Sequence, residues 1–316
     1  MLIAFVHTGK AFLPGMAAYS DYFSGLGVNT RVVLKKNLKG LKPDVEWHFM
    51  GVHSRKMCPG SVIIHEYASA STPPFANLKN AIKKRVNIKP DFRIFLNDYV
   101  REKLDFNDSV PHGYRNLGLN DEFLNAPIKF SDSEKKYDFI YVGMTAYDVH
   151  FRKMLDHFIE AFRERSLLIL SKNYDRLSKH YQMNKNIVFA GPVPQSEIPA
   201  YIRSSRFAIN FRFNVEPYKW QTSTKLLEYA ACKTPVITSD LPWVREFQQE
   251  YGGRYFYLKD DLTNFTWDNI NQFDYTFPDL SELTWEYQIK RSGVLDFLSA
   301  KFPDTRWPGT ISPYKF

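Results

Sequence analysis

The chain has 316 residues, of which 44% are hydrophobic and 24% charged, with a net charge of +8 and two cysteines. This length exceeds the usual size of a single hydrophobic core and predicts two domains in a soluble globular protein. The sequence contains no apolar run of roughly 18 residues, which excludes a membrane span, and two cysteines exclude a disulfide framework. The first residues are typical of a strand rather than a signal peptide, so we expect a cytoplasmic protein.

In chain order, the first part of the sequence alternates between strand and helix patterns. Apolar or β-branched runs predict strands at residues 2–7, 30–34, 47–52, 61–65 and 92–97, and helical patterns occupy 15–26, 77–86 and 98–104. This βαβ order predicts a parallel sheet with helices on both of its faces.

Residues 123–137 interrupt this alternation with a polar, proline-containing segment, and we expect a linker at 126–136. A second alternating unit follows, with strands at 138–142, 167–170, 187–189 and 207–210 and helices at 151–165, 175–182 and 196–204. The predicted organisation is a first domain over 1–125, a second over 137–280, and a helix with a tail over 281–316.

Residues 222–246, TSTKLLEYAACKTPVITSDLPWVRE, combine a hydroxyl-rich helix start with a β-branched strand. Lys225 and Glu228 lie three positions apart and therefore share one helix face. The hydroxyls of Ser223 and Thr224, the helix N–H groups and the lysine suit phosphate oxygens, and the glutamate suits the hydroxyls of a ribose. The segment therefore predicts a binding site for a nucleoside diphosphate.

The string K-L-L-E-Y-A-A-x-x-x-P-V-I resembles the nucleotide-sugar site of GT-B glycosyltransferases, in particular the family 4-like group (glycosyl transferases group 1). The resemblance implies an α/β fold of two Rossmann-like, doubly wound domains facing a cleft, with a final helix that crosses back to the first domain. It also implies that Glu228 holds the donor ribose and that Ser223, Thr224 and Lys225 hold the diphosphate.

The same resemblance implies further donor contacts in the second domain. Gly143 follows the strand FIYV, Arg152 lies in the next helix, and Gly191 belongs to NIVFAGP, which resembles the turn beside the donor base. We expect no metal and no cofactor besides the nucleotide-sugar, since the sequence has no Cys/His ligand spacing, no Walker-type phosphate loop and no G-x-G-x-x-G. Each of these glycines could also serve only in a turn between strand and helix, and Arg152 could also be an exposed charged residue of a helix.

In the first domain, two positions at carboxyl ends of strands are candidates for contact with substrates. Gly9 and Lys10 lie in the loop after the first strand, which borders the cleft in this architecture. His65 and Glu66 close another strand, where Glu66 is a candidate general base for an inverting enzyme and His65 a candidate donor-sugar contact for a retaining one. Structural roles remain open for both.

One position departs from the family pattern. Family 4 enzymes usually carry a glutamate eight residues before the second one, and Trp220 stands there in this chain. Glu216 is twelve residues before Glu228 and reaches the sugar only if the intervening loop folds differently. The retaining or inverting outcome therefore stays open.

Positive charge is concentrated in the first part of the chain, because residues 1–130 contain 18 Lys/Arg and 11 Asp/Glu. Such a face suits an anionic membrane, a phosphorylated acceptor or nucleic acid, and it also fits a merely solvated surface. We expect a glycosyltransferase acting on a glycan or lipid-linked acceptor in bacterial surface polysaccharide assembly, in peripheral contact with the inner face of the membrane. Two alternatives stay open: a phage-type transferase that glycosylates DNA bases, and a non-catalytic scaffold that binds nucleotide or glycan.

Overall fold

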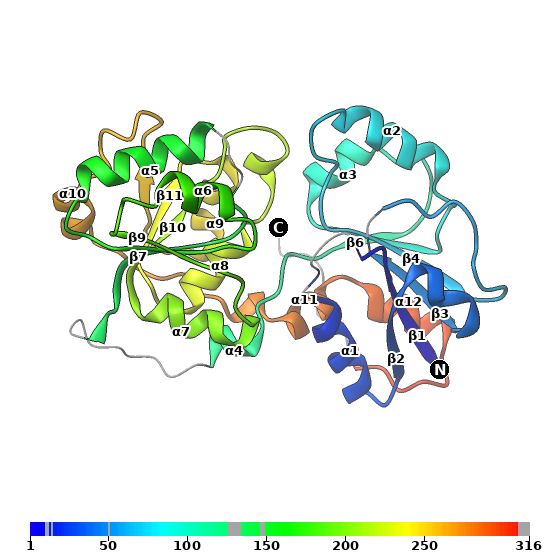
Figure 1. Cartoon of the computed structure of the whole chain (residues 1–316). Helices are drawn as coiled ribbons and strands as arrows, with labels where there is room; N and C mark the ends of the chain where they lie inside the picture. The colour runs from blue at the N-terminus through cyan, green and yellow to red at the C-terminus, as the bar shows by residue number, and fades with distance from the viewer. Residues whose placement is uncertain (10–12, 14, 50, 126–133, 146–148, 309–316) are drawn as a thin grey trace. The chain divides into compact units, whose positions relative to one another are not determined.

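The computed structural model describes residues 1–9, 13, 15–49, 51–125, 134–145 and 149–308. The chain forms two compact units, one made of Met1–Gly118 and Glu282–Phe316 and the other of Leu119–Ser281 (Figure 1). The first unit thus ends at Gly118, earlier than the expected boundary at 125. Most of the expected linker, residues 126–133, lies outside the described residues.

Unit 1 is built on a six-stranded parallel sheet with the strand order β2-β1-β3-β4-β5-β6. Its strands are β1 (Leu2–His7), β2 (Asn29–Leu34), β3 (Val45–Phe49), β4 (Val62–Tyr67), β5 (Phe92–Phe95) and β6 (His112–Tyr114). Its helices are α1 (Gly15–Gly25), α2 (Ala76–Val86), α3 (Asp98–Leu104), α11 (Trp285–Arg291) and α12 (Val294–Lys301). Figure 1 shows α2 and α3 on one face of this sheet and α1, α11 and α12 on the other. The expected strand at 47–52 is observed earlier, as β3, because the chain turns at Gly51 with φ +88°.

The C-terminal segment packs closely into unit 1. The Trp285 ring lies edge-on to Tyr19, with centroids 5.8 Å apart, in a core that includes Phe5 and Trp47. A Cβ at Gly118 would overlap the Trp285 ring, and a Cβ at Gly113 would overlap the backbone carbonyl of Ser292. Side chains are therefore excluded at both glycines by close packing of the segment against the rest of the unit.

Unit 2 is a second six-stranded parallel sheet with the order β12-β11-β10-β7-β8-β9. Its strands are β7 (Tyr137–Val142), β8 (Leu167–Leu170), β9 (Ile187–Ala190), β10 (Ser205–Asn210), β11 (Val236–Ser239) and β12 (Phe256–Leu258). Its helices are α4 (Asp121–Leu124), α5 (Val149–Ala161), α6 (Asp175–His180), α7 (Ile198–Arg203), α8 (Thr224–Ala231), α9 (Pro242–Tyr251) and α10 (Trp267–Gln272), and they cover both faces of the sheet (Figure 1).

Both sheets reverse their strand order at one point. In unit 1 the switch point lies between β1 and β3: the chain adds β2 on one side of β1 and then β3 to β6 on the other. In unit 2 the switch point lies between β7 and β10. Ligands of open α/β sheets bind outside the carboxyl ends of the strands at such a switch point. The expected fold of two doubly wound α/β units is confirmed, and it directs attention to the ends of β7 and β10. No helix in the described ranges is long and apolar enough to cross a bilayer.

Candidate functional site

The switch point of unit 2 lies where β7 and β10 end side by side, and α8 begins shortly after β10. The N-cap of α8 is Ser223, whose Oγ accepts a hydrogen bond from the Leu226 N–H. The same hydroxyl donates to Asn210 Oδ1 at 2.6 Å, and Asn210 Nδ2 donates to Thr238 Oγ1 at 2.9 Å. These three buried polar side chains fix the start of α8 to the ends of β10 and β11.

Lys225 and Glu228 face one another on α8, as their spacing predicts, with Nζ and Oε2 3.1 Å apart. The Glu228 side chain is only 6% exposed, and burial raises the pKa of its carboxyl, while the charge of Lys225 acts in the opposite sense. A buried carboxylate with one cationic partner retains lone pairs that can accept hydrogen bonds from vicinal hydroxyls. Thr224 is the first residue of α8, so its side chain belongs to the same helix start.

Arg212 is a member of this site that the sequence reasoning missed. It follows β10, donates from Nη1 to the backbone carbonyl of Gln221 at 3.0 Å, and lies over the Tyr218 ring at 5.8 Å. Burial lowers the pKa of its guanidinium, and the only charges that counteract this shift belong to Tyr141 and Tyr218. Within the described ranges this half-buried cation has no carboxylate partner, which makes it ready to receive an anion. A basic residue directly after a strand that ends at a switch point is a signal that could have identified it.

The two glycines expected near the donor lie at carboxyl ends of strands. Gly143 follows β7 and has φ +154°, and the adjacent Val142 N–H donates to the Tyr229 hydroxyl of α8 at 2.8 Å. This bond ties the end of β7 to α8. Gly191 follows β9, where a Cβ would stand 3.6 Å from the Tyr174 ring. The structure thus joins Gly143 to the α8 site and places Gly191 two strands farther along the sheet.

The remaining donor-side residues have other neighbours. Arg152, on α5, lies against Tyr181, where burial raises the pKa of the phenol and the Arg152 charge lowers it. Trp220 belongs to a single 3₁₀ turn, with Lys219 Nζ 5.5 Å from its ring centroid. Glu216 pairs with Lys219 at 3.8 Å and is half exposed. The structure therefore associates Glu216 with its own loop rather than with Glu228.

In unit 1, Glu66 occupies a buried ion pair that does not suit the expected role of general base. One carboxylate oxygen accepts from the Arg115 guanidinium, and the other accepts from Trp47 Nε1 at 2.8 Å. The Arg115 guanidinium also lies over the Trp285 ring. With both oxygens occupied and the residue 1% exposed, Glu66 links β4 to the C-terminal segment. The geometry therefore favours a structural role for Glu66, and the catalytic role stays a prediction.

His65 lies in a buried cluster with His53 and His48. His65 Nε2 and His53 Nδ1 are 2.9 Å apart, and His48 Nε2 is 3.1 Å from Glu46 Oε2. The ligand atoms of Glu46, His48 and His53 lie within 4.8 Å of one another, as in a metal site. The His48 and His53 rings also stack, with centroids 3.6 Å apart and planes 21° apart, and their Nε2 atoms lie 3.1 and 3.9 Å from Glu46 Oε2. In this arrangement the cluster is a hydrogen-bonded network.

We expect this cluster to make the protein labile to acid. Burial and the nearby His48 lower the pKa of His53 to about 3, so the unfolded chain binds its proton more readily than the folded chain as the pH falls from about 6.5 toward 3. Burial alone would raise the pKa of Glu46, but hydrogen bonds from His48 and Ser61 lower it to about 2, so its contribution is complete above pH 4.5 and is lost toward pH 2. Urea denaturation as a function of pH should show the free energy of unfolding falling through both windows.

A matched pair of variants tests the assignment. His53→Gln should flatten the pH dependence between pH 6.5 and 4.5, whereas His180→Gln, at an exposed position on α6, should leave it unchanged. An unaltered slope in His53→Gln would contradict the assignment.

Of the loop residues expected after β1, Gly9 is described and Lys10 lies outside the described residues. Gly9 has φ +77°, a left-handed conformation that favours glycine, and the position of a Cβ there would be 3.0 Å from Leu34 Cδ2. It lies two residues after the end of β1, at the switch point of unit 1.

Comparisons with known proteins agree with this fold. Residues 152–265 match a family model described as glycosyl transferase-like. No curated protein sequence matches the chain. Among solved structures, the chain is similar to an alpha-glucosyltransferase in complex with UDP and a 13-mer DNA containing an HMU base (12% identity, TM-score 0.58, covering 86% of this chain and 89% of that one).

Two further structures cover nearly the whole chain. AviGT4, a glycosyltransferase involved in avilamycin A biosynthesis, is 13% identical with a TM-score of 0.55 and 97% of each chain covered. The UDP-GlcNAc 2-epimerase of Methanocaldococcus jannaschii is 11% identical with a TM-score of 0.57, covering 94% of this chain and 100% of that one. At such identities the likeness concerns the fold. The chain therefore has the GT-B fold, and its residues 152–265 match a glycosyl transferase-like family model.

Proposed function

We propose that the protein transfers a sugar from a nucleoside-diphosphate sugar to a hydroxyl group of an acceptor. The observation that carries this proposal is the half-buried Arg212, which has no carboxylate partner in the described ranges and lies beside the start of α8, close in sequence to the Lys225–Glu228 pair. The glycosyl transferase-like family match over residues 152–265 supports it. Because two of the similar structures contain or act on UDP compounds, UDP is the first donor nucleotide to test.

In this proposal the site acts mainly on the leaving group. Arg212, Lys225 and the N–H groups at the start of α8 hold the diphosphate, and Glu228 accepts hydrogen bonds from the ribose hydroxyls. The acceptor oxygen attacks the anomeric carbon while the bond to the diphosphate breaks, and the cations and helix dipole stabilise the negative charge that develops there. This mechanism assigns no role to a metal or a further cofactor.

We expect Lys225→Ala and Glu228→Ala each to weaken UDP binding by about tenfold or more, since each loses charge-assisted or ionic hydrogen bonds. Isothermal titration calorimetry with UDP measures the effect. Lys185→Ala and Glu164→Ala are matched controls, because both residues lie near the amino ends of the strands of the same unit. Unchanged affinity in both site variants would overturn the assignment. Release of UDP from UDP-sugars distinguishes an enzyme from a scaffold that only binds.

We further infer that the acceptor is presented at an anionic membrane surface, as expected for a lipid-linked glycan in surface polysaccharide assembly. Helix α2 supports this inference because its outward face is apolar: Phe75, Leu78, Ile82 and Val86 are between 42% and 74% exposed, whereas Asn80 faces inward. Cationic side chains accompany this face at Lys79, Lys83, Lys84 and Arg85. An apolar face with flanking cations is typical of helices that lie in a membrane interface.

Co-sedimentation with vesicles of phosphatidylglycerol and phosphatidylcholine tests the membrane inference. Leu78→Ser combined with Ile82→Ser should reduce the bound fraction markedly, whereas Val149→Ser combined with Met183→Ser, at exposed apolar positions of unit 2, should not. Equal binding of both double variants would contradict the role of α2. Salt-sensitive retention on duplex DNA, without binding to vesicles, would favour the DNA-base alternative instead.

A further inference from the structure

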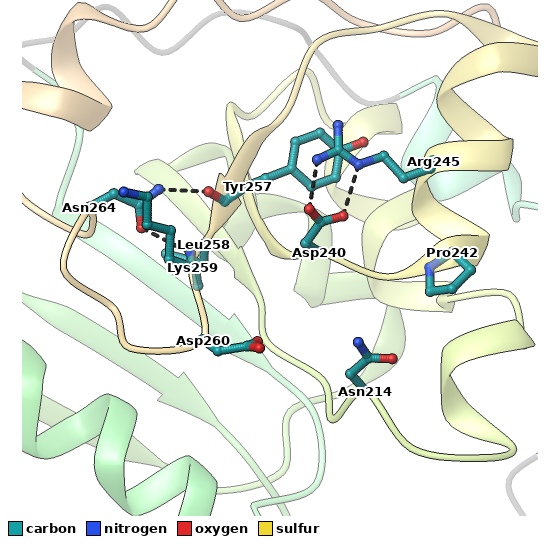
Figure 2. A pocket seen from close by; sticks show the side chains of 9 residues that line it. All are labelled: Asn214, Asp240, Pro242, Arg245, Tyr257, Leu258, Lys259, Asp260 and Asn264. Atoms are coloured by element: carbon teal, nitrogen blue, oxygen red, sulfur yellow. Dashed lines mark hydrogen bonds and ion pairs between the residues drawn. The ribbon is translucent and has the colours of Figure 1, made fainter.

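A pocket of about 710 Å³ lies at the carboxyl ends of β11 and β12 in unit 2 (Figure 2). Asp240 follows β11, Tyr257 and Leu258 end β12, and Asn214 comes from the loop between β10 and α8. The pocket therefore lies beside the switch-point site rather than in it, and the loop that carries Asn214 also carries Arg212. Its volume falls within the usual range for small-molecule sites.

One wall of this pocket is rigidly held. Arg245 and Asp240 form two parallel hydrogen bonds of 2.8 and 2.7 Å, and the guanidinium lies 3.5 Å from the centroid of the Tyr257 ring. The Tyr257 hydroxyl donates to Gln248 at 2.6 Å. Asn264 closes the turn after β12 by accepting from the Lys259 N–H and donating to the Tyr257 carbonyl. The wall thus exists before any ligand arrives.

Two polar side chains of the pocket make no polar interaction with the rest of the described chain. Within the described part of the chain, the Asp260 carboxylate and the Asn214 amide have no hydrogen-bond or ion-pair partner, and both residues are exposed. Figure 2 shows both side chains pointing toward the space beside the Asp240–Arg245 pair. A free carboxylate accepts two hydrogen bonds, and a free amide both donates and accepts.

We propose that this pocket binds a sugar ring through its hydroxyl groups. Its charges balance, with Asp240 and Asp260 against Arg245 and Lys259, and the Arg245 fork is already occupied by Asp240. An anion would meet the free Asp260 carboxylate and a cation would meet Lys259, whereas neutral hydroxyls satisfy carboxylate and amide alike. This inference rests on the proposed transfer of a sugar, and the ring belongs either to the donor or to the acceptor glycan.

A second hollow in unit 2 serves as an internal comparison. It has a similar volume, about 680 Å³, and includes Glu164 and Asn184, but it lies at the amino ends of β7, β8 and β9. Ligands of open α/β sheets bind at the carboxyl ends, so this second pair of one carboxylate and one amide side chain should not bind sugar. Asn184→Ala combined with Glu164→Ala is therefore the matched control for Asn214→Ala combined with Asp260→Ala.

The experiment compares the wild type and both double variants of the full chain in three measurements. Ligand-observed NMR with millimolar glucose, galactose, mannose and N-acetylglucosamine reports binding of free sugar. Calorimetry gives the affinity for UDP-glucose and UDP-N-acetylglucosamine relative to UDP, and release of UDP with maltose or cellobiose as acceptor gives KM for the acceptor. We expect Asn214→Ala with Asp260→Ala to bind free sugar at least about tenfold more weakly, with UDP affinity unchanged and the control unaffected.

The outcomes separate the sources of the sugar. A loss of UDP-sugar affinity relative to UDP assigns the ring to the donor, and a raised acceptor KM with normal UDP-sugar affinity assigns it to the acceptor glycan. Wild-type behaviour of the Asn214/Asp260 variant in all three measurements would overturn the proposal. A wild type that binds free sugar but not UDP would instead refute the proposed function and leave the pocket assignment standing.

Discussion

Glu66→Gln is expected to lower the free energy of unfolding by about 3–5 kcal/mol, because it leaves the buried Arg115 cation without its counter-ion. Burial lowers the pKa of the Arg115 guanidinium, but the charge of Glu66, the interaction with Tyr19 and the hydrogen bonds to both together raise the pKa overall. The substitution also disturbs the hydrogen bond from Trp47 Nε1. Urea denaturation followed by tryptophan fluorescence reports the change, since Trp47 and Trp285 both lie in this core.

Two companion variants show whether the ion pair is the cause. Glu286→Gln removes the same charge from a surface pair with Lys290 on α11 and should cost no more than about 0.5 kcal/mol. Adding Arg115→Met to Glu66→Gln should cost much less than the sum of the single changes, because no unpaired charge then remains. A stable Glu66→Gln protein whose sugar transfer is lost would restore the catalytic interpretation.

The difference between expectation and structure at Glu66 has a clear origin. Its place at the carboxyl end of a strand is readable from the apolar run before it, and that place suggested contact with substrate. Its partner Arg115 lies 49 positions away in the chain, and the Trp285 ring that lies against Arg115 comes from the far C-terminal segment. No local pattern indicates a long-range buried ion pair, so the sequence alone left both roles open.

Local sequence patterns were sufficient to predict structure where the contacting residues are close together in the chain. The Lys225–Glu228 pair and the Ser223 N-cap follow from spacing and residue type within α8. The alternation of strands and helices predicted the strands of both sheets except the short edge strands β6 and β12. One helix was expected in the segment 281–316, and the left-handed Gly293 divides it into α11 and α12. The clustering of His48, His53 and His65 depends on strand order, because His48 and His65 are paired across β3 and β4.

Arg212→Ala is expected to weaken UDP binding by about 10- to 100-fold, the largest loss of affinity that we expect from any single substitution at the α8 site. A guanidinium donates charge-assisted hydrogen bonds to a diphosphate, and a net loss of about 1.5–3 kcal/mol on its removal corresponds to about 10- to 100-fold in affinity. Arg206→Ala is the matched control, because Arg206 lies at the amino end of the same strand, beside Asp138. Calorimetry with UDP compares the two variants.

The stability of the Arg212→Ala protein provides a second, independent test of the role of Arg212 in ligand binding. Burial disfavours the charged form of this side chain, and its described partners are a backbone carbonyl and aromatic rings instead of a carboxylate. Removing it should therefore leave the ligand-free protein as stable as the wild type or more so, and should abolish most of the thermal stabilisation that UDP gives. If Arg212 only held the loop in place, its replacement would instead destabilise the protein in the absence of UDP. Weaker UDP binding together with undiminished stability of the ligand-free protein would indicate that Arg212 serves to bind the ligand and does not stabilise the fold.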